Sequence, residues 1–340
     1  MEIDGSYGEG GGQILRTAVA LSAITKKPIR IKNIRANRPN PGIKPQHYVA
    51  IKSIRDICNA ETNGLEIDSS NLEFLPKKVK GGEYKFDIGT AGSTILVFQA
   101  CILASLKTNE PLTITLTGGT DVKWSPSWDY FKHVFLPLIR KTGVSVNARL
   151  IKRGYYPKGG GEALLTIHPN KKIQPLQLDK KQEFSKVNGI INISNLPDHV
   201  SNRIKHAAIK TLFKKNLRSS IEIEQASSLS SGTGITLWTQ TEDTVMGSTV
   251  LGERGVSSEE VGETAALNLL REIESDATLD VHAFDQLIPY MAISRNIGYS
   301  SCIVCELSSH AKTNMWLIKQ FFDVNFEAKQ SEYNIAITVR

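Results

Sequence analysis

The chain has 340 residues, of which 40% are hydrophobic and 22% charged, a composition typical of a globular protein with one large or two ordinary domains. No segment approaches the roughly 18 consecutive apolar residues of a membrane-spanning helix, and residues 1–16 lack the basic start and apolar run of a signal peptide, so we expect a cytoplasmic protein without a membrane partner. Four cysteines in this length exclude a disulfide framework, and Cys302-x-x-Cys305 has no second pair at zinc-finger spacing.

The net charge of +7 is concentrated in one segment. Residues 26–55 contain nine lysines and arginines and no acidic residue, which leaves 32 basic against 34 acidic residues elsewhere. A local basic block beside a glycine-rich loop favours a polyanionic substrate, a nucleotide or a nucleic acid. For Lys26, Lys27 and Lys52 we prefer the alternative, a solvated helix face.

The glycine-rich loop lies at residues 5–16, GSYGEGGGQILR, where five glycines and one carboxylate precede an apolar helical pattern. Glycine lets the backbone approach a ligand and point N–H groups at it. The carboxylate of Glu9 would repel a phosphate unless a divalent cation lay between them, which favours a magnesium-type ion held by Glu9 and the substrate's phosphates. The pattern matches neither the Walker A motif nor the dinucleotide fingerprint, and a plain turn is the alternative.

A strand is predicted over residues 28–34, and residues 35–47, RANRPNPGIKPQH, are predicted to form a stiff loop with three prolines. Arginines fixed on such a loop suit oxyanion recognition, because little rotamer freedom is lost on binding. The donors that it projects are Arg35, Arg38, Lys44, Gln46 and His47. Arg35 and His47 could equally be structural. A helix is predicted to follow at residues 48–58.

The same order of elements begins again at residue 81. A strand, a glycine turn at residues 89–94, a long apolar helix carrying Gln99, a strand at 112–116, a loop and a helix at 131–140 are predicted. Strands at 144–149 and 163–167 follow. We therefore expect internal repeats of a βαβαββ kind.

Residues 171–186 are polar and are predicted to be a connector. The next residues have the pattern of a compact α/β unit, with strands at 189–194, 219–224 and 234–241 and helices at 197–213 and 258–274. We interpret residues 186–275 as an inserted small α/β domain, and residues 1–185 with 276–340 as the large catalytic domain.

The last chemical signal is a histidine after a predicted buried strand, residues 302–307, and before a helical pattern, residues 313–322. His310 is predicted on the bend between them. Unpaired N–H groups and the positive end of a helix dipole hold an anion at such a place, and an imidazole there can attack it. The alternative is a polar loop residue near a helix cap.

Seven segments, in this order, resemble the RNA 3′-terminal phosphate cyclases: GSYGEGGGQILRT, NIRANRPNPGIKPQH, DIGTAGST, GGTDVKWSP, RGYYPKGGGE, DQLIPYMA and SSHAKTN. The resemblance implies an α/β (α+β) fold with a large domain of three βαβαββ repeats and a smaller inserted α/β domain. It also implies an ATP-dependent, AMP-forming ligase. ATP adenylates a histidine that matches His310, AMP passes to an RNA 3′-terminal phosphate, and the neighbouring 2′-hydroxyl displaces AMP to leave a 2′,3′-cyclic phosphate.

The resemblance also implies the ligand contacts. Glu9 would bind Mg²⁺ or Mn²⁺, and Asp285 would lie next to the catalytic histidine, which Asn314 would brace. The nucleotide and its phosphates would be contacted by Arg16, Arg38, Gln46, Gln99, Pro126, Tyr130, His282 and Gln286. The family often carries a tyrosine at the position of His282, and a histidine ring stacks more weakly on adenine.

Three alternatives compete with this interpretation. A non-catalytic cyclase-like protein of ribosome assembly would lack the nucleophile, whereas His310 is present. An enolpyruvyl transferase is built from similar repeats but usually has twin domains rather than one insertion. Plain RNA binding does not explain Glu9 in the glycine loop. Lys123, Trp124 and Trp128 are candidate RNA contacts, with a core or rim position as the alternative for each tryptophan. An association of identical subunits is left open.

Overall fold

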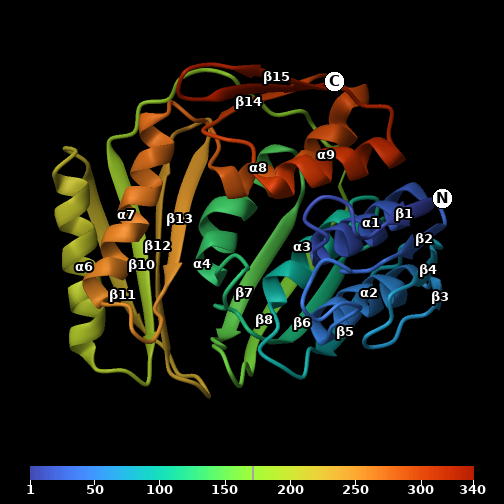
Figure 1. Ribbon diagram of the computed structural model, residues 1–340, viewed down its shortest axis with the longest axis horizontal. Helices are drawn as coiled ribbons and strands as arrows, with labels where there is room; N and C mark the ends of the chain where they lie inside the picture. Colours follow the sequence, from blue (N-terminus) through green and yellow to red (C-terminus); the bar gives the residue numbers. More distant parts are fainter. Residues whose placement is uncertain (171) are drawn as a thin grey trace.

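The computed structural model describes residues 1–170 and 172–340, and it contains the order βαβαββ three times. In the first repeat, at the right of Figure 1 in blue, two parallel strands are joined by an antiparallel pair in the order β1-β2-β4-β3. Its elements are β1 (Glu2–Asp4), α1 (Gly12–Thr25), β2 (Ile29–Lys32), α2 (Pro45–Cys58), β3 (Glu61–Asn63) and β4 (Leu72–Leu75).

The second repeat has the same topology, with the sheet order β5-β6-β8-β7. Side chains alternate between buried and partly exposed along β6 and β8, so one face of this sheet packs on the core. Its second helix is interrupted by a π-helical turn, Phe131–Phe135. The elements are β5 (Gly82–Asp87), α3 (Thr94–Ala104), β6 (Leu112–Gly118), α4 (Trp128–Tyr130), α5 (Leu136–Lys141), β7 (Val146–Lys152) and β8 (Gly161–Ile167).

The third repeat is divided by a long insertion. Its first strand, β9 (Gln177–Leu178), pairs in parallel with β14, where Cys302 lies opposite Leu178, and the sheet order is β9-β14-β16-β15. The remaining elements follow the insertion: α8 (Val281–Ile293), β14 (Ser300–Val304), α9 (Ser309–Phe321), β15 (Phe326–Gln330) and β16 (Ile335–Val339). Three sheets of one topology confirm the predicted fold class.

The inserted segment forms a fourth sheet in the order β11-β10-β12-β13. Helices α6 and α7 cover one face and bury a separate apolar cluster, while α4 of the second repeat packs against the other face (Figure 1). The elements are β10 (Lys186–Ser194), α6 (Asp198–Phe213), β11 (Arg218–Gln225), β12 (Gly232–Gln240), β13 (Val245–Leu251) and α7 (Ser258–Glu274). The domain boundaries at residues 186 and 275 stay a prediction.

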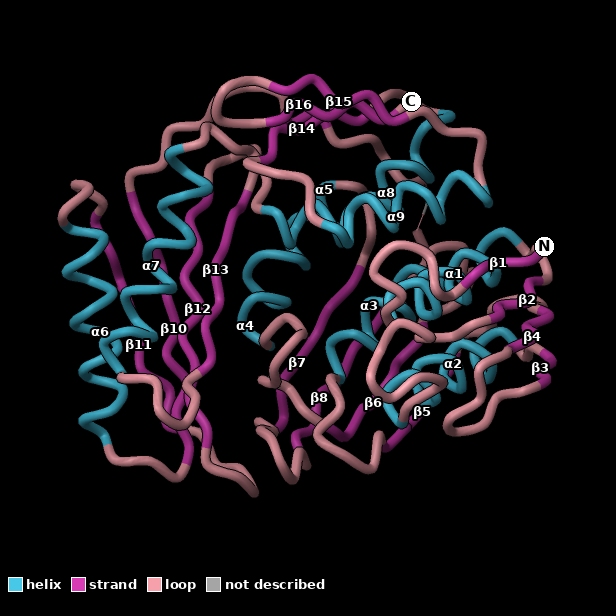
Figure 2. Tube along the Cα trace, in the orientation of Figure 1, coloured by secondary structure: helices cyan, strands magenta, loops and turns pink. Residues whose placement is uncertain are grey.

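Helices from the three repeats meet in the interior, with the sheets outside them (Figure 2). α1 packs on α3 and α9, and α8 packs on α9. α3 carries apolar residues on every side, as a fully enclosed helix requires, and Gln99 is its one long polar side chain. No helix in the described ranges has the length and apolar character needed to cross a membrane.

Several predicted boundaries were wrong for identifiable reasons. α9 begins at Ser309 instead of residue 313, because the hydroxyl of Ser308 accepts the N–H of Ala311 (2.9 Å) and caps the helix. His310 therefore lies in the first helical turn, not on a bend. α2 begins at Pro45, so Gln46 and His47 belong to a helix rather than to the loop.

The strand predicted at residues 302–307 lies at Ser300–Val304. Within the predicted connector, residue 171 lies outside the described residues, and Gln177–Leu178 form β9. Strand β13 was not predicted from the sequence. The short strand β9 is stabilised by a partner distant in sequence, a contact that local patterns do not contain.

Candidate active site

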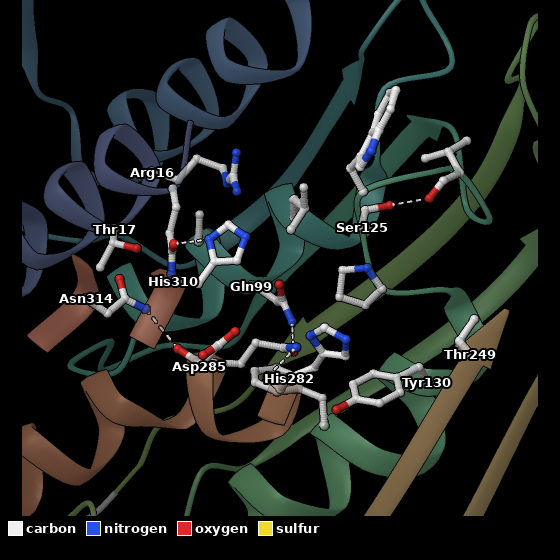
Figure 3. Close-up of a pocket in the computed structure, with 18 of the residues that line it drawn as sticks. Arg16, Thr17, Gln99, Ser125, Tyr130, Thr249, His282, Asp285, His310 and Asn314 are labelled. Carbon is white, nitrogen blue, oxygen red and sulfur yellow. Dashed lines mark hydrogen bonds between the residues drawn. The ribbon is translucent and has the colours of Figure 1, made fainter. Parts of the chain in front are cut away.

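A cavity of about 650 Å³ opens where the central helices meet the inserted sheet. Its wall contains residues of α1, α3, α8 and α9, the loop at residues 122–126, and β13 (Figure 3). Eight of the predicted site residues line it: Arg16, Gln99, Pro126, Tyr130, His282, Asp285, Gln286 and His310. Glu9, Arg38 and Gln46 do not line it. The roles of all these residues stay predictions.

His310 is the second residue of α9, and its ring is half-exposed. Its Nδ1 atom lies 2.6 Å from Oε1 of Gln13 and 2.8 Å from Oε2 of Glu9. Both neighbours are acceptors, so they favour the tautomer with the proton on Nδ1. Among the described residues Nε2 has no hydrogen-bond partner, and its lone pair is therefore available to an electrophile. The hydrogen bond to Glu9 raises the pKa of His310.

The glycine loop lies directly against α9. Tyr7 stacks on Trp316 of that helix, with ring centroids 3.8 Å apart and planes at 10°. Gly8 has a φ of +60°, and a Cβ there would lie 2.5 Å from Oγ1 of Thr313. A Cβ on Gly12 would lie 2.0 Å from Nε2 of His47. Glycine is thus required for the close approach that carries Glu9 to the histidine.

Glu9 contacts two basic side chains of the site. Its Oε1 accepts a hydrogen bond from the guanidinium of Arg38, and its Oε2 faces His310. The hydrogen bond with His310 and the nearby guanidinium lower the pKa of Glu9, so the carboxylate is ionised at neutral pH. Burial lowers the pKa of Arg16 to about 10, and its guanidinium still carries charge at neutral pH inside the cavity. Together Arg16 and Arg38 provide positive charge on the side of the cavity where His310 lies.

Three residues of the proline-containing segment have structural partners. Arg35 donates to the carbonyls of Asn40 and Gly42 (2.7 and 3.0 Å) and so braces the loop. His47 is buried behind the glycine loop, and burial together with the charge of Arg16 lowers its pKa to about 3. Oε1 of Gln46 accepts the N–H of Ser93 (2.8 Å) at the start of α3. For Arg35 and His47 the structure favours the structural alternative.

The opposite wall of the cavity is aromatic and amide-rich. Tyr130 is buried, and its hydroxyl donates to Oδ1 of Asp280 (2.6 Å), which also caps α8. The side chain of Gln99 donates to that of Gln286, which in turn donates to the carbonyl of His282 (2.8 Å). The first of these bonds joins α3 to α8, and the second lies within α8. Figure 3 shows Gln99, His282 and Tyr130 on this side of the cavity.

Asp285 contacts the start of α9, and its charge also helps to raise the pKa of the nearby His310. Its Oδ1 accepts the hydroxyl of Ser308 (2.6 Å), the residue that caps α9, and burial raises its pKa to about 6. Asn314 donates to the backbone carbonyl of Asp285 (2.8 Å), and no bond to His310 is found in the described part of the chain. Asn314 thus ties α9 to α8, and the expectation that it braces His310 stays a prediction.

The donor set around Glu9 limits how a metal ion could be held. Residues 1–170 and 172–340 contain no group of three or more His, Cys, Asp and Glu side chains suited to a metal. A single carboxylate fits an ion whose other ligands are water and the oxygens of a bound phosphate, the mode typical of Mg²⁺. Cys302 is buried in β14, and burial raises the pKa of its thiol, as expected for a core residue.

Sequence reasoning missed Gln13, Thr17 and Ser308. Gln13 and Thr17 share one side of α1 with Arg16, at the spacing of one helical turn, while most other residues of α1 are apolar. That polar stripe was a usable signal. Ser308 could have been found as a helix cap, because a serine two residues before the histidine precedes an apolar helical pattern.

Comparison with known proteins gives a consistent result. The family model described as RNA 3′-terminal phosphate cyclase matches residues 7–328. The chain is 44% identical over 327 residues to the RNA 3′-terminal phosphate cyclase of Pyrococcus furiosus, covering 96% of this chain and 94% of the relative. It is 44% identical to the protein of that name from Methanosarcina barkeri (100% and 99% covered) and 40% identical to that of Nitrosospira multiformis (100% and 96%).

Among solved structures, the enolpyruvyl transferase NikO from Streptomyces tendae aligns with 99% of this chain and 48% of its own. The TM-score is 0.37 and the sequence identity is 9%. A similarity of this size carries no argument about the reaction.

Proposed function

Because this chain belongs to the RNA 3′-terminal phosphate cyclases, we propose that His310 is the nucleophile that takes AMP from ATP and that its neighbours hold the nucleotide in the cavity. The chain is an ATP-dependent ligase that converts the 3′-phosphate of an RNA into a 2′,3′-cyclic phosphate. This reaction requires a nucleophile and positive charge near the phosphates, and the cavity wall contains groups of both kinds.

The first step is adenylation of the histidine. Nε2 of His310 attacks the α-phosphorus of ATP, a nitrogen–phosphorus bond forms, and the bond from phosphorus to the pyrophosphate oxygen breaks. The observation that carries this assignment is the pair of acceptors on Nδ1, Gln13 at 2.6 Å and Glu9 at 2.8 Å. They keep the proton on Nδ1 and stabilise the imidazolium character that develops as Nε2 bonds to phosphorus.

The cavity wall supports a nucleotide in one orientation. Arg16 lies near His310 and would neutralise charge on the phosphates, as would Arg38 from beside Glu9. Tyr130, Pro126 and His282 form the apolar side of the same cavity and suit the adenine ring. Gln99 and Gln286, joined by a hydrogen bond, add polar groups to the same side.

Glu9 would hold the metal ion. Mg²⁺ or Mn²⁺ at Glu9 would supply positive charge to the phosphate oxygens and weaken the bond to the leaving pyrophosphate. The hydrogen bond with His310 and the nearby guanidinium of Arg38 lower the pKa of Glu9, which keeps its carboxylate ionised and therefore able to bind a cation.

The later steps use the same charges. An oxygen of the RNA 3′-phosphate attacks the phosphorus of the histidine-bound AMP, and Nε2 leaves as a neutral imidazole. The neighbouring 2′-hydroxyl then attacks the 3′-phosphorus, loses its proton and displaces AMP. A histidine leaving group divides one difficult transfer into easier steps.

We also propose that residues 1–185 with 276–340 form one domain and residues 186–275 a second, in a protein that acts in the cytoplasm. The separate apolar cluster between the inserted sheet and its helices supports this division. The free state of Cys58, Cys101, Cys302 and Cys305 is consistent with a reducing compartment.

The test is to incubate the protein with ATP labelled in the α-phosphate and either metal. We expect AMP attached by a bond that is labile in acid and stable in alkali. His310→Ala should abolish labelling and keep the wild-type circular dichroism, whereas His206→Ala, an exposed histidine on α6, should label normally. If His310→Ala is still labelled, another nucleophile is used.

Glu9→Ala tests the metal site. The metal concentration for half-maximal labelling should rise at least about tenfold. Substitution of a residue that only supports a metal ligand already lowers metal affinity by about this factor. Nucleotide binding should persist, because Arg16 and the aromatic wall are intact. An unchanged metal requirement would remove Glu9 from the ligand set.

A further inference from the structure

The loop at residues 121–129 holds an aromatic side chain outside the protein. Trp124 is 95% exposed, and its backbone is left-handed, with a φ of +60°. The neighbouring Trp128 is 2% exposed and belongs to the core. A large indole in full contact with water is unfavourable, and a left-handed backbone at a residue other than glycine adds strain, so such a position suggests a function.

This exposure does not come from a loose loop. Both ends of the loop are fixed by the buried guanidinium of Arg153, which donates to Asp121 (3.0 Å) and to both carboxylate oxygens of Asp129 (3.0 and 2.9 Å). Between them Ser125 donates to the carbonyl of Val122 (2.9 Å), and Lys123 pairs with Glu253 (2.5 Å) after β13. The indole is therefore presented on a fixed support.

The loop at residues 121–129 borders the cavity. Lys123, Trp124, Ser125 and Pro126 all belong to the wall that also contains His310. Figure 3 shows Ser125 and Thr249 across the cavity from Thr17 and Asn314. Pro126 and the buried Tyr130 line the inner part of the cavity, whereas the exposed Trp124 lies at the mouth of the cavity.

The two substrates differ in how they occupy such a cavity. ATP can be enclosed completely, but an RNA chain that enters by its 3′ end must leave again through the mouth. A flat aromatic ring at the exit suits the face of an unpaired base, because stacking tolerates any sequence. The adenine of ATP is already accounted for by the inner wall in the proposed function.

We propose that Trp124 is a stacking platform for an unpaired nucleobase near the 3′ end of the RNA substrate. This inference rests on the proposed function, since it requires RNA in the cavity of His310. It adds a contact that selects single-stranded ends, and it leaves the histidine chemistry to other residues.

The test measures RNA binding and histidine labelling separately. The Kd of a single-stranded oligoribonucleotide with a 3′-phosphate should rise about 5- to 140-fold in Trp124→Ala, which corresponds to about 1–3 kcal/mol. Trp124→Phe should keep most of the affinity. Phe213→Ala, which removes another exposed aromatic ring (76%) from the end of α6, should bind like wild type. Labelling by ATP alone should be unchanged in all three variants.

A second comparison identifies the stacked base. Oligonucleotides that lack one base at each of the last three positions are bound to wild type and to Trp124→Ala. At the stacked position the missing base should weaken wild-type binding and make no further difference in the variant. Unchanged affinity in Trp124→Ala, or additive losses at all three positions, would overturn the proposal.

The labelling experiment distinguishes a failure of the Trp124 proposal from a failure of the proposed function. If Trp124→Ala loses labelling by ATP alone, the indole serves the nucleotide and the proposal is wrong. If wild type itself is not labelled, the proposed function fails, and RNA binding still decides the role of Trp124.

Discussion

Glu272 gives a stability prediction that can be worked out from the structure. It lies near the end of α7, where the inserted domain returns to α8. Its Oε1 accepts the N–H of Val281 (3.3 Å), and its Oε2 is buried without a partner among the described residues. Burial, together with the negative charge of Asp280, raises the pKa of Glu272 from 4.5 to about 7.

The raised pKa makes the ionised carboxylate a destabilising group. Below pH 4.5 the side chain is protonated in both states and has no effect. Between pH 4.5 and about 7 the unfolded chain releases the proton first, so the free energy of unfolding falls as the pH rises. Well above pH 7 the carboxylate is ionised in both states and the penalty is complete, at about 3 kcal/mol.

Glu272→Gln removes this ionisation and keeps the acceptor for Val281. By calorimetry the variant should melt about 4 °C above wild type at pH 8, for an unfolding entropy of about 2.1 cal/mol/K per residue over the chain. The two proteins should melt together near pH 4.

Glu274→Gln is the matched control for this measurement. Its carboxylate is exposed and pairs with Lys215, so the substitution should change the melting temperature little at any pH. A difference between Glu272→Gln and wild type that does not grow between pH 5 and pH 8 would refute the reasoning.

Two further substitutions test the supports of the site. Arg153→Met leaves two buried carboxylates without their cation and should destabilise the protein by about 3–5 kcal/mol in urea unfolding. An exposed ion pair contributes at most about 1 kcal/mol to the free energy of unfolding. A smaller loss than this in Arg153→Met would contradict the inference that the buried network stabilises the protein. Trp316→Ala removes the ring under Tyr7 and should slow histidine labelling about 2- to 13-fold, equivalent to about 0.5–1.5 kcal/mol. Trp316→Phe should restore the rate, and an unchanged rate in Trp316→Ala would show that the stack does not position Glu9.

The repeated architecture could be predicted because hydrophobic periodicity is local. The alternation of apolar residues in β6 and their helical spacing in α7 lie within each segment itself. Accordingly, α7 was predicted at residues 258–274, the range observed. Two such sets in the same order predicted internal repeats, and the family resemblance implied a third. Element ends were less accurate, because caps such as Ser308 depend on single side chains.

The contacts within the site could not be derived from the sequence. Gln13 reaches His310 across 297 positions, and Arg153 reaches Glu224 across 71. The structural role of His47 depends on its burial behind Gly12, a tertiary contact between α2 and the glycine loop. Motifs identified the chemical groups, but packing determines which partner each group meets.

The repeats explain why the polar groups converge. α1, α3 and α8 are the first helices of the three repeats, and all three contribute to the cavity wall. Arg16 is the fifth residue of α1, Gln99 the sixth of α3, and Asp285 and Gln286 the fifth and sixth of α8. Equivalent helices that pack around one interior place the same helical turn at the centre. Polar residues at that turn face one cavity, so the repeated architecture brings a guanidinium, a carboxyl and two amides together there.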